Sequence, residues 1–186
     1  MDKTKDYARV TTILNAVGLT DFSSIPERDR QFYMDRGTAN HLAWEMQELG
    51  TADDFIFDPV VEEFRPAHKK FLEETGFKAL PGGIEMVVSN DTLRIKGRLD
   101  RFGMMNGRKC VIDFKTNSLR PEVAIQTALY TLCLPDHFFE IDRYAVAFTK
   151  TGKYLLLKCP ERKDKDIALA AVTLYWWKKS NGKLEA

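Results

Sequence analysis

Apolar positions in the N-terminal part of the chain recur with the spacing of α-helices rather than of β-strands. Residues 8–17 predict a short helix, and residues 23–27 predict a loop that leads into the next helix. Residues 59–75 predict a further helix, with a proline in its first turn, a kink at Pro66 and an end at Gly76. We therefore expect this part of the chain to be largely helical.

The longest helical pattern covers residues 29–49 and predicts one long helix or a broken pair of helices. Most of its apolar residues have helical spacing, namely Phe32, Met34, Leu42, Met46 and Leu49. Gly37 lies inside this pattern, where glycine costs about 1 kcal/mol relative to alanine. We therefore expect either a break in the helix or a close approach of another segment at Gly37.

The centre of the chain changes to the two-residue period of β-strands. Residues 84–88 alternate weakly, whereas residues 93–102 alternate clearly. In the second run one face carries Leu93, Ile95, Gly97 and Leu99, and the other carries Arg94, Lys96, Arg98 and Asp100. Asn106-Gly107 predicts a tight type I′ hairpin, so residues 109–115 are expected to return as the neighbouring strand.

The C-terminal part combines both patterns. Residues 121–134 predict a helix, and residues 143–149 and 153–159 predict a second hairpin. Residues 163–179 predict a closing helix whose apolar face contains Ile167, Ala170, Leu174 and Trp177. The order of these elements predicts one α/β domain over residues 1–186, with a central mixed β-sheet flanked by helices.

Composition narrows the class of protein only moderately. A net charge of +1 neither requires nor excludes a polyanionic partner, although it argues mildly against a large DNA footprint. No apolar run approaches the roughly 20 residues that a membrane-spanning helix needs, and we expect a cytoplasmic protein without a membrane contact. Cys110, Cys133 and Cys159 are far apart and odd in number, so we expect reduced cysteines rather than a disulfide framework or a zinc site.

The residues that point to chemistry are Asp100, Asp113 and Lys115. Residues two apart on a strand share a face, and the Asn106-Gly107 turn brings Asp100 beside Asp113, about 5 Å away on the adjacent strand. Two carboxylates at that distance repel each other unless a cation lies between them, which indicates a site for Mg2+ or Mn2+. Lys115 would orient or deprotonate an attacking water, or stabilise charge on a phosphate. The alternative is a surface ion pair, which Asp-x-Lys on a strand forms more often.

Four stretches resemble the PD-(D/E)xK nuclease superfamily, specifically its RecB-like and lambda-exonuclease-like branch. They occur in the order of that family, within a core of about residues 36–130, and are Arg36-Gly37-Thr38-Ala39-Asn40-His41, Gly97-Arg98-Leu99-Asp100-Arg101, Ile112-Asp113-Phe114-Lys115-Thr116 and Gln126-Thr127-Ala128-Leu129-Tyr130. The resemblance implies a restriction-endonuclease-like core, which agrees with the α/β order predicted above.

The resemblance also implies a role for each matching residue. His41, Asp100 and Asp113 match the metal ligands of the family, together with the backbone carbonyl of Phe114. Lys115 matches its catalytic lysine. Gln126 and Tyr130 match the helix that supports the lysine or contacts a DNA phosphate, and Glu85 resembles an acidic residue that would serve a second metal ion, directly or through water; a solvated carboxylate is the alternative for Glu85.

The implied function is a Mg2+- or Mn2+-dependent deoxyribonuclease, more an exonuclease than an endonuclease, in DNA recombination, repair or phage DNA processing. The alternatives are a structure-specific endonuclease and a non-catalytic DNA-binding or assembly subunit that retains the fold. Related nucleases of CRISPR adaptation hold an iron–sulfur cluster on four cysteines, which this chain lacks, so no such cluster is expected. DNA is the implied partner, and a recombination or single-strand-binding protein would be a second. The stripe of Arg94, Lys96 and Arg98 is a candidate for guiding the DNA backbone, or else a solvated strand face.

Overall fold

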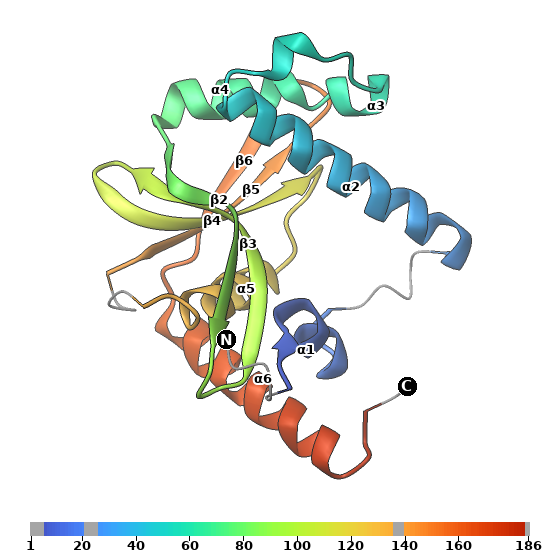
Figure 1. The fold of residues 1–186 in the computed structure, drawn as a ribbon, viewed down its shortest axis with the longest axis vertical. Coiled ribbons are helices and arrows are strands. Elements are labelled where there is room, and N and C mark those ends of the chain that lie inside the picture. Colours follow the sequence, from blue (N-terminus) through green and yellow to red (C-terminus); the bar gives the residue numbers. More distant parts are fainter. Residues whose placement is uncertain (1–5, 21–25, 136–139, 185–186) are drawn as a thin grey trace.

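A computed structural model describes residues 6–20, 26–135 and 140–184 of the chain (Figure 1). Its helices and strands are mixed along the chain, with a mainly helical N-terminal part before the central strands. They are β1 (Ala8–Arg9), α1 (Val10–Ala16), α2 (Glu27–Glu48), the 3-10 helix η1 (Ala52–Asp54), α3 (Pro59–Glu62), α4 (Arg65–Thr75), β2 (Lys78–Asn90), β3 (Ile95–Met105), β4 (Arg108–Thr116), α5 (Val123–Thr131), β5 (Asp142–Phe148), β6 (Tyr154–Lys158) and α6 (Arg162–Ser180).

The strands form one six-stranded mixed sheet, as the sequence predicted. β3 is antiparallel to β2 and β4, β4 is parallel to β5, and β5 is antiparallel to β6. β2 follows one edge of β3 from Met104 back to Ile95. The other edge is divided, since β1 pairs with it at Ile95 and Lys96 and β4 pairs with it from Arg101 onward. The two partners therefore diverge around residues 97–100 of β3, which leaves that stretch accessible to side chains.

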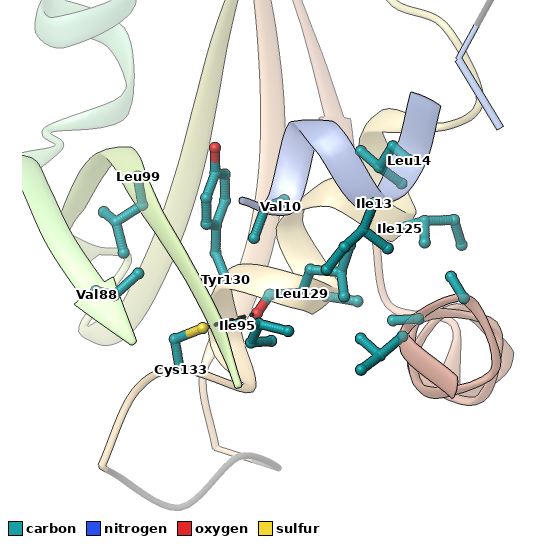
Figure 2. Packing of buried hydrophobic residues seen from close by; sticks show 14 of the residues in the cluster. Val10, Ile13, Leu14, Val88, Ile95, Leu99, Ile125, Leu129, Tyr130 and Cys133 are labelled. Atoms are coloured by element: carbon teal, nitrogen blue, oxygen red, sulfur yellow. Dashed lines mark hydrogen bonds between the residues drawn. The ribbon is translucent and has the colours of Figure 1, made fainter. Parts of the chain in front are cut away.

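Helices cover both faces of this sheet, and each side has its own apolar core. On one side α1, α5 and α6 pack against the sheet through a cluster that includes Ile13, Leu99 and Leu129 (Figures 1 and 2). On the other side α2 and α4 pack through an aromatic cluster centred on Trp44, Phe71, Phe114 and Phe148. The central strands are thus buried on both faces, which accounts for the continuous apolar run that leads into Asp113.

The two predicted hairpins are confirmed. Asn106 and Gly107 have φ angles of 52° and 73°, the left-handed conformation that a type I′ turn requires at both positions. Gly152, at 71°, turns the chain between β5 and β6. Strand boundaries shift elsewhere: residues 8 and 9 form β1 rather than helix, and residues 93 and 94 belong to a turn rather than to β3.

The helix predicted over residues 29–49 is a single unbroken helix, α2, so the expected break at Gly37 is wrong. No close approach explains that glycine either, because an added Cβ would meet no atom within 4 Å. A cost of about 1 kcal/mol is small beside the burial of the helix through Ala43 and Trp44. In contrast, a break does occur in the helix predicted over residues 59–75, where α4 starts afresh with Pro66 in its first turn.

The predicted apolar face of the last helix is also wrong. α6 buries Asp164, Ala168, Ala171, Val172 and Tyr175, whereas Ile167, Ala170, Leu174 and Trp177 face outward. The rotation of the helix is set at its first turn, because the Asp164 carboxylate forms a buried ion pair with Arg143 at 3.0 Å. Small residues one and two turns later then allow close packing against α5.

In the described part of the chain, no helix is both long enough and apolar enough to cross a membrane. Cys110, Cys133 and Cys159 are buried thiols and form no disulfide. Residues 23–25 of the predicted loop before α2 lie outside the described residues.

Candidate metal centre

Three predicted site residues lie close together, one each on α2, β2 and β3. His41 of α2, Glu85 of β2 and Asp100 of β3 each offer one ligand atom, and these atoms lie within 4.8 Å of one another. His41 Nδ1 is 3.1 Å from Glu85 Oε1 and 3.8 Å from Asp100 Oδ1. An imidazole nitrogen and two carboxylate oxygens, drawn from three separate elements, form a ligand set that suits a divalent cation.

The two carboxylates give this group an excess of negative charge, which shifts the pKa of His41. Burial disfavours protonation of His41, but the Asp100 carboxylate and the Glu85 hydrogen bond outweigh it and raise the pKa of His41 above its usual value of 6.5. For Glu85, burial raises the pKa, but His41, Arg101 and Arg98 outweigh burial and lower it. The imidazolium therefore partly neutralises the two acids in the position where a metal ion would lie.

Glu85 holds an unusual backbone conformation. Its φ angle is +48°, in the left-handed region that non-glycine residues rarely adopt. The β2–β3 pairing is irregular between Ala79 and Ile84, just before Glu85, so a bulge redirects the strand there. Arg98 Nε then contacts Glu85 Oε2 at 3.1 Å, and Arg101 Nη1 donates to Oε1 at 3.2 Å. Such strain is concentrated at functional sites, where the surroundings fix it.

Asp100 lies where the β3–β4 pairing ends. The last paired residues are Arg101 and Ile112, and two residues beyond Ile112 the Phe114 N–H donates to Asp100 Oδ2 at 2.7 Å. The Asp100 side chain thus replaces a backbone carbonyl as hydrogen-bond acceptor at the end of the β3–β4 pairing. This bond fixes Asp100 close to the segment that carries Asp113 and Lys115.

Asp113 is a buried carboxylate of the site. It is 1 % exposed; its Oδ1 has no hydrogen-bond partner, and its Oδ2 contacts the Lys115 ammonium. Burial, reinforced by the nearby Asp100 carboxylate and opposed by Lys115, raises the pKa of Asp113 from 3.8 to about 6. Its charge is opposed mainly by the ammonium of Lys115, whose Nζ is 2.5 Å from Oδ2. A buried acid with one oxygen that accepts no hydrogen bond is expected where the carboxylate binds a cation.

Lys115 lies on the same side of β4 as Asp113 and is 39 % exposed. Burial disfavours its charged form, but the Asp113 and Asp100 carboxylates outweigh burial and raise its pKa above 10.5. The side chain is therefore an ammonium group that donates hydrogen bonds at the centre, and not a free amine.

Tyr130 and Gln126 of α5 approach the centre from the opposite layer. The Tyr130 ring stands between Leu99 and Val10 with its hydroxyl directed away from the apolar cluster (Figure 2). Gln126 Nε2 donates to that hydroxyl at 3.3 Å. Burial, followed by the charges of Asp100 and Asp113, raises the pKa of Tyr130, so the hydroxyl remains a proton donor. Gly97 makes room for the ring, because a Cβ there would be 2.7 Å from Tyr130 Cε1.

A buried polar network supports the centre from the α2 side, and sequence reasoning assigned it no role. Arg101 is fully buried, and its Nε donates to Glu48 Oε1 at 2.7 Å. The same oxygen is 3.1 Å from His68 Nε2, and the Arg101 guanidinium lies over the Phe114 ring at 5.0 Å. The strand period gives no signal for it, because Leu99, two residues earlier, packs into the core on the other side of the sheet.

Three adjoining cavities surround the centre. The His41 cavity, of about 370 Å3, is lined by His41, Glu45, Glu85, Arg98 and Asp100 among others. The Tyr130 cavity, of about 500 Å3, shares Arg98 with it and adds Arg9, Lys96 and Tyr130. The Lys115 cavity, of about 560 Å3, shares Thr11 with the Tyr130 cavity and contains Lys115 and Gln126.

The predicted basic stripe divides between two places. Lys96 and Arg98 line the Tyr130 cavity. Arg94 does not line it; its guanidinium stacks on the Trp176 ring at 3.9 Å, and its φ angle of +53° belongs to the turn before β3. The structure thus brings two of the three cations to the site.

The residues present fit a hard divalent ion. The tight group supplies one nitrogen and two carboxylate oxygens, and the adjacent Asp113 carries two buried oxygens, of which Oδ2 contacts Lys115 and Oδ1 has no hydrogen-bond partner. Oxygen-rich ligand sets of this kind suit Mg2+ or Mn2+.

Comparisons with known proteins agree with the fold. No protein-family model matches the chain, and no curated protein matches it. A solved structure described as a "putative exonuclease" from Eubacterium rectale is similar, with a TM-score of 0.56 and 11% identity, over 97% of this chain and 83% of that chain. An alkaline exonuclease from Laribacter hongkongensis is 12% identical over 95% of this chain and 94% of that chain, with a TM-score of only 0.43. At such identities the likeness concerns the fold, and the chain has the α/β fold of the first of these structures, as its resemblance to the PD-(D/E)xK nucleases predicted.

Proposed function

We propose that this chain is a Mg2+- or Mn2+-dependent deoxyribonuclease that hydrolyses DNA phosphodiester bonds. One observation carries the proposal: the His41, Glu85 and Asp100 ligand atoms lie together beside the buried Asp113 carboxylate, whose Oδ2 contacts Lys115 Nζ and whose Oδ1 has no hydrogen-bond partner. Burying an acid with an unpaired oxygen is destabilising, so the arrangement is explained by a cation that binds there. The nuclease-like fold supports the same function.

His41, Asp100, Asp113 and the carbonyl of Phe114 would hold the ion. Glu85 lies close to His41 and Asp100, which favours its binding the same ion. If a second ion binds, Glu85 is the residue that would hold it. A bound Mg2+ or Mn2+ supplies Lewis acidity to the phosphoryl oxygen and acidifies a bound water. The Phe114 N–H keeps the Asp100 carboxylate oriented, since it donates to the oxygen that faces β4.

Lys115 would place its ammonium against the scissile phosphate. Its Nζ contacts Asp113, so the positive charge of Lys115 lies directly beside the proposed metal ligand. In that position it stabilises the negative charge that develops on the phosphate oxygens during hydrolysis. Gln126 and Tyr130 would act beside it: Gln126 orients the Tyr130 hydroxyl, which stays protonated and donates toward a phosphate oxygen.

DNA is the proposed substrate because the cavities beside the acidic centre are basic. The Tyr130 cavity contains Arg9, Lys96 and Arg98 and no acid. A compact basic groove of this size agrees with a net charge near zero for the whole chain. We propose exonuclease activity in recombination, repair or phage DNA processing, carried out by one nuclease domain over residues 1–186.

The test is a survey of DNA forms with each metal. End-labelled linear DNA, single- and double-stranded, and circular DNA are incubated with Mg2+, Mn2+ or EDTA. We expect the label to be released from linear DNA only with metal, and Asp113→Asn to abolish release. Asp166→Asn, an exposed acid of α6, is the matched control and should leave the rate unchanged. A folded protein that cuts none of these forms, or an Asp113→Asn variant with full activity, would overturn the proposal.

A further inference from the structure

The first three turns of α2 pack on little of the protein. The buried side chains of this helix are Asn40, Ala43 and Trp44, all in its C-terminal half. The end that begins at Glu27 extends past the sheet and lies above α1 (Figure 1). Phe32, Tyr33 and Met34 are nevertheless aromatic or apolar, and they are 56 %, 44 % and 66 % exposed. These side chains contribute little to the core, so another role is needed to explain them.

This projecting end forms one wall of the Lys115 cavity. Tyr33 and Arg36 line the cavity from α2, Thr11 lines it from α1, and Gln126 lines it from α5. Lys115, at the end of β4, belongs to the same lining. Tyr33 therefore faces the space that leads to the proposed reaction centre, and Phe32 and Met34 do not line it.

Tyr33 and Arg36 already form a stack. The Arg36 guanidinium carbon is 4.9 Å from the centre of the Tyr33 ring, and the Phe32 ring meets the Tyr33 ring edge-on at 5.7 Å. Arg36 Nε is buried without a hydrogen-bond partner. Tyr33 and Arg36 are thus one helical turn apart and place a flat, partly exposed ring beside a guanidinium. At least the Nε–H of that guanidinium has no hydrogen-bond acceptor.

The charge of the cavity selects an anionic ligand. Its cationic lining residues are Arg36, Lys115 and Arg120, against one acid, Glu122. The adjoining Tyr130 cavity adds three more cations and no acid. A ligand that carries both flat rings and regularly spaced negative charges fits this lining, and an unpaired nucleic-acid strand has both. A duplex fits less well, because its base faces are stacked on one another and cannot meet Tyr33.

We propose that Tyr33 and Arg36 bind an unpaired DNA strand beside the reaction centre, with a base stacked on the Tyr33 ring and a backbone phosphate on the Arg36 guanidinium. The inference rests on the proposed nuclease function and refines its substrate: the strand that reaches Lys115 is single-stranded there, either as a single strand or as a frayed end. Tyr33 and Arg36 are binding residues and have no part in the bond-breaking step.

The test measures binding apart from cleavage. A fluorescent oligothymidylate of roughly ten nucleotides and a blunt duplex are titrated in EDTA against Asp113→Asn protein, with and without a second substitution. Tyr33→Leu should weaken binding of the single strand roughly 5- to 150-fold, as the loss of one base stack predicts, whereas Tyr33→Trp should retain it. Arg36→Gln should also weaken binding and reduce its dependence on salt by about one phosphate contact.

Phe55→Leu is the matched control, because Phe55 is another exposed aromatic residue and lines none of the three cavities. It should bind the strand as the parent protein does, and thermal unfolding should show that Tyr33→Leu is folded. Equal binding by Tyr33→Leu and its parent, or an equal loss for single strand and duplex, would overturn the inference while the wild-type protein still cuts DNA. A wild-type protein that neither binds nor cuts DNA would overturn the proposed function and this inference together.

Discussion

His41 and Glu85 are hydrogen-bonded across 44 residues of chain, with Nδ1 3.1 Å from Oε1, at the point where we propose that a divalent ion binds. The neighbouring carboxylates raise the pKa of His41, so its imidazole holds a proton above the usual pH of about 6.5. A metal ion requires the neutral imidazole, so binding must release that proton. The hydrogen bond and the metal are therefore alternatives.

The first prediction concerns the pH dependence of metal binding. We expect the affinity for Mn2+ to rise with pH through the pKa of His41, which lies above 6.5. In Glu85→Gln that pKa falls, so the midpoint should move to lower pH even though the affinity at high pH is weaker. Electron paramagnetic resonance of free Mn2+ measures both. A pH-independent affinity between pH 6 and 9, values chosen to span roughly the titration range of histidine, would contradict this account.

The second prediction concerns the stability cost of Asp113. A carboxyl group whose pKa is raised on folding costs stability at pH values above that raised pKa, here about 6, and the cost disappears as the pH falls below 3.8. Asp113→Asn should therefore stabilise the metal-free protein at pH 7.5, by up to about 3 kcal/mol. Near pH 4 most of the gain should be lost.

Thermal unfolding in EDTA at both pH values measures the effect. Mn2+ should raise the Tm of the wild-type protein more than that of Asp113→Asn. If Asp113→Asn is less stable than wild type in EDTA at pH 7.5, the claim that the buried Asp113 carboxylate destabilises the metal-free protein is contradicted.

The third prediction concerns the buried pair of Arg101 and Glu48. Arg101→Met leaves the Glu48 carboxylate buried without its main partner, so we expect a loss of about 3–5 kcal/mol in the free energy of unfolding. Glu48→Gln on the same background should recover a substantial part, because the uncompensated charge is removed. Urea unfolding of the two single variants and the double variant gives the coupling energy. Additive losses would show that the pair is not coupled.

The fourth prediction concerns Gly97. A methyl group at this position would lie 2.7 Å from a ring carbon of Tyr130, which is packed in the core and cannot swing away. Gly97→Ala should cost about 1–3 kcal/mol of stability through overpacking. It should also displace the Tyr130 hydroxyl and lower the cleavage rate. Combining it with Tyr130→Leu should restore most of the stability but none of the activity; a double variant as unstable as Gly97→Ala would contradict the proposed clash.

Strand period and turn chemistry made the central part of the fold predictable. Alternation fixed which residues of β3 and β4 share a face, and Asn106-Gly107 fixed how those strands pair. The helices were harder, because apolar spacing does not say which of two possible faces is covered. α2 buries Asn40 and Trp44 and exposes Phe32 and Met34, two of the apolar residues whose spacing predicted the helix.

The supporting network was beyond the reach of sequence patterns. Arg101 finds Glu48 from 53 residues away, and a charged residue in a strand ordinarily indicates a solvent-facing position. The left-handed φ of Glu85 follows a bulge between Ala79 and Ile84, where Pro81-Gly82-Gly83 is a sequence signal that the strand prediction did not use. Long-range pairing decides the contact of Arg101 with Glu48, so only the structure reveals it.

The most direct test of the metal centre is the rate at which end-labelled DNA is hydrolysed as Mn2+ is titrated, in the wild type and in Asp113→Asn. We predict a saturable dependence on Mn2+ in the wild type, no hydrolysis in EDTA, and no hydrolysis by Asp113→Asn at any Mn2+ concentration. Hydrolysis that persists in EDTA, or that follows the same Mn2+ curve in both proteins, would contradict the account.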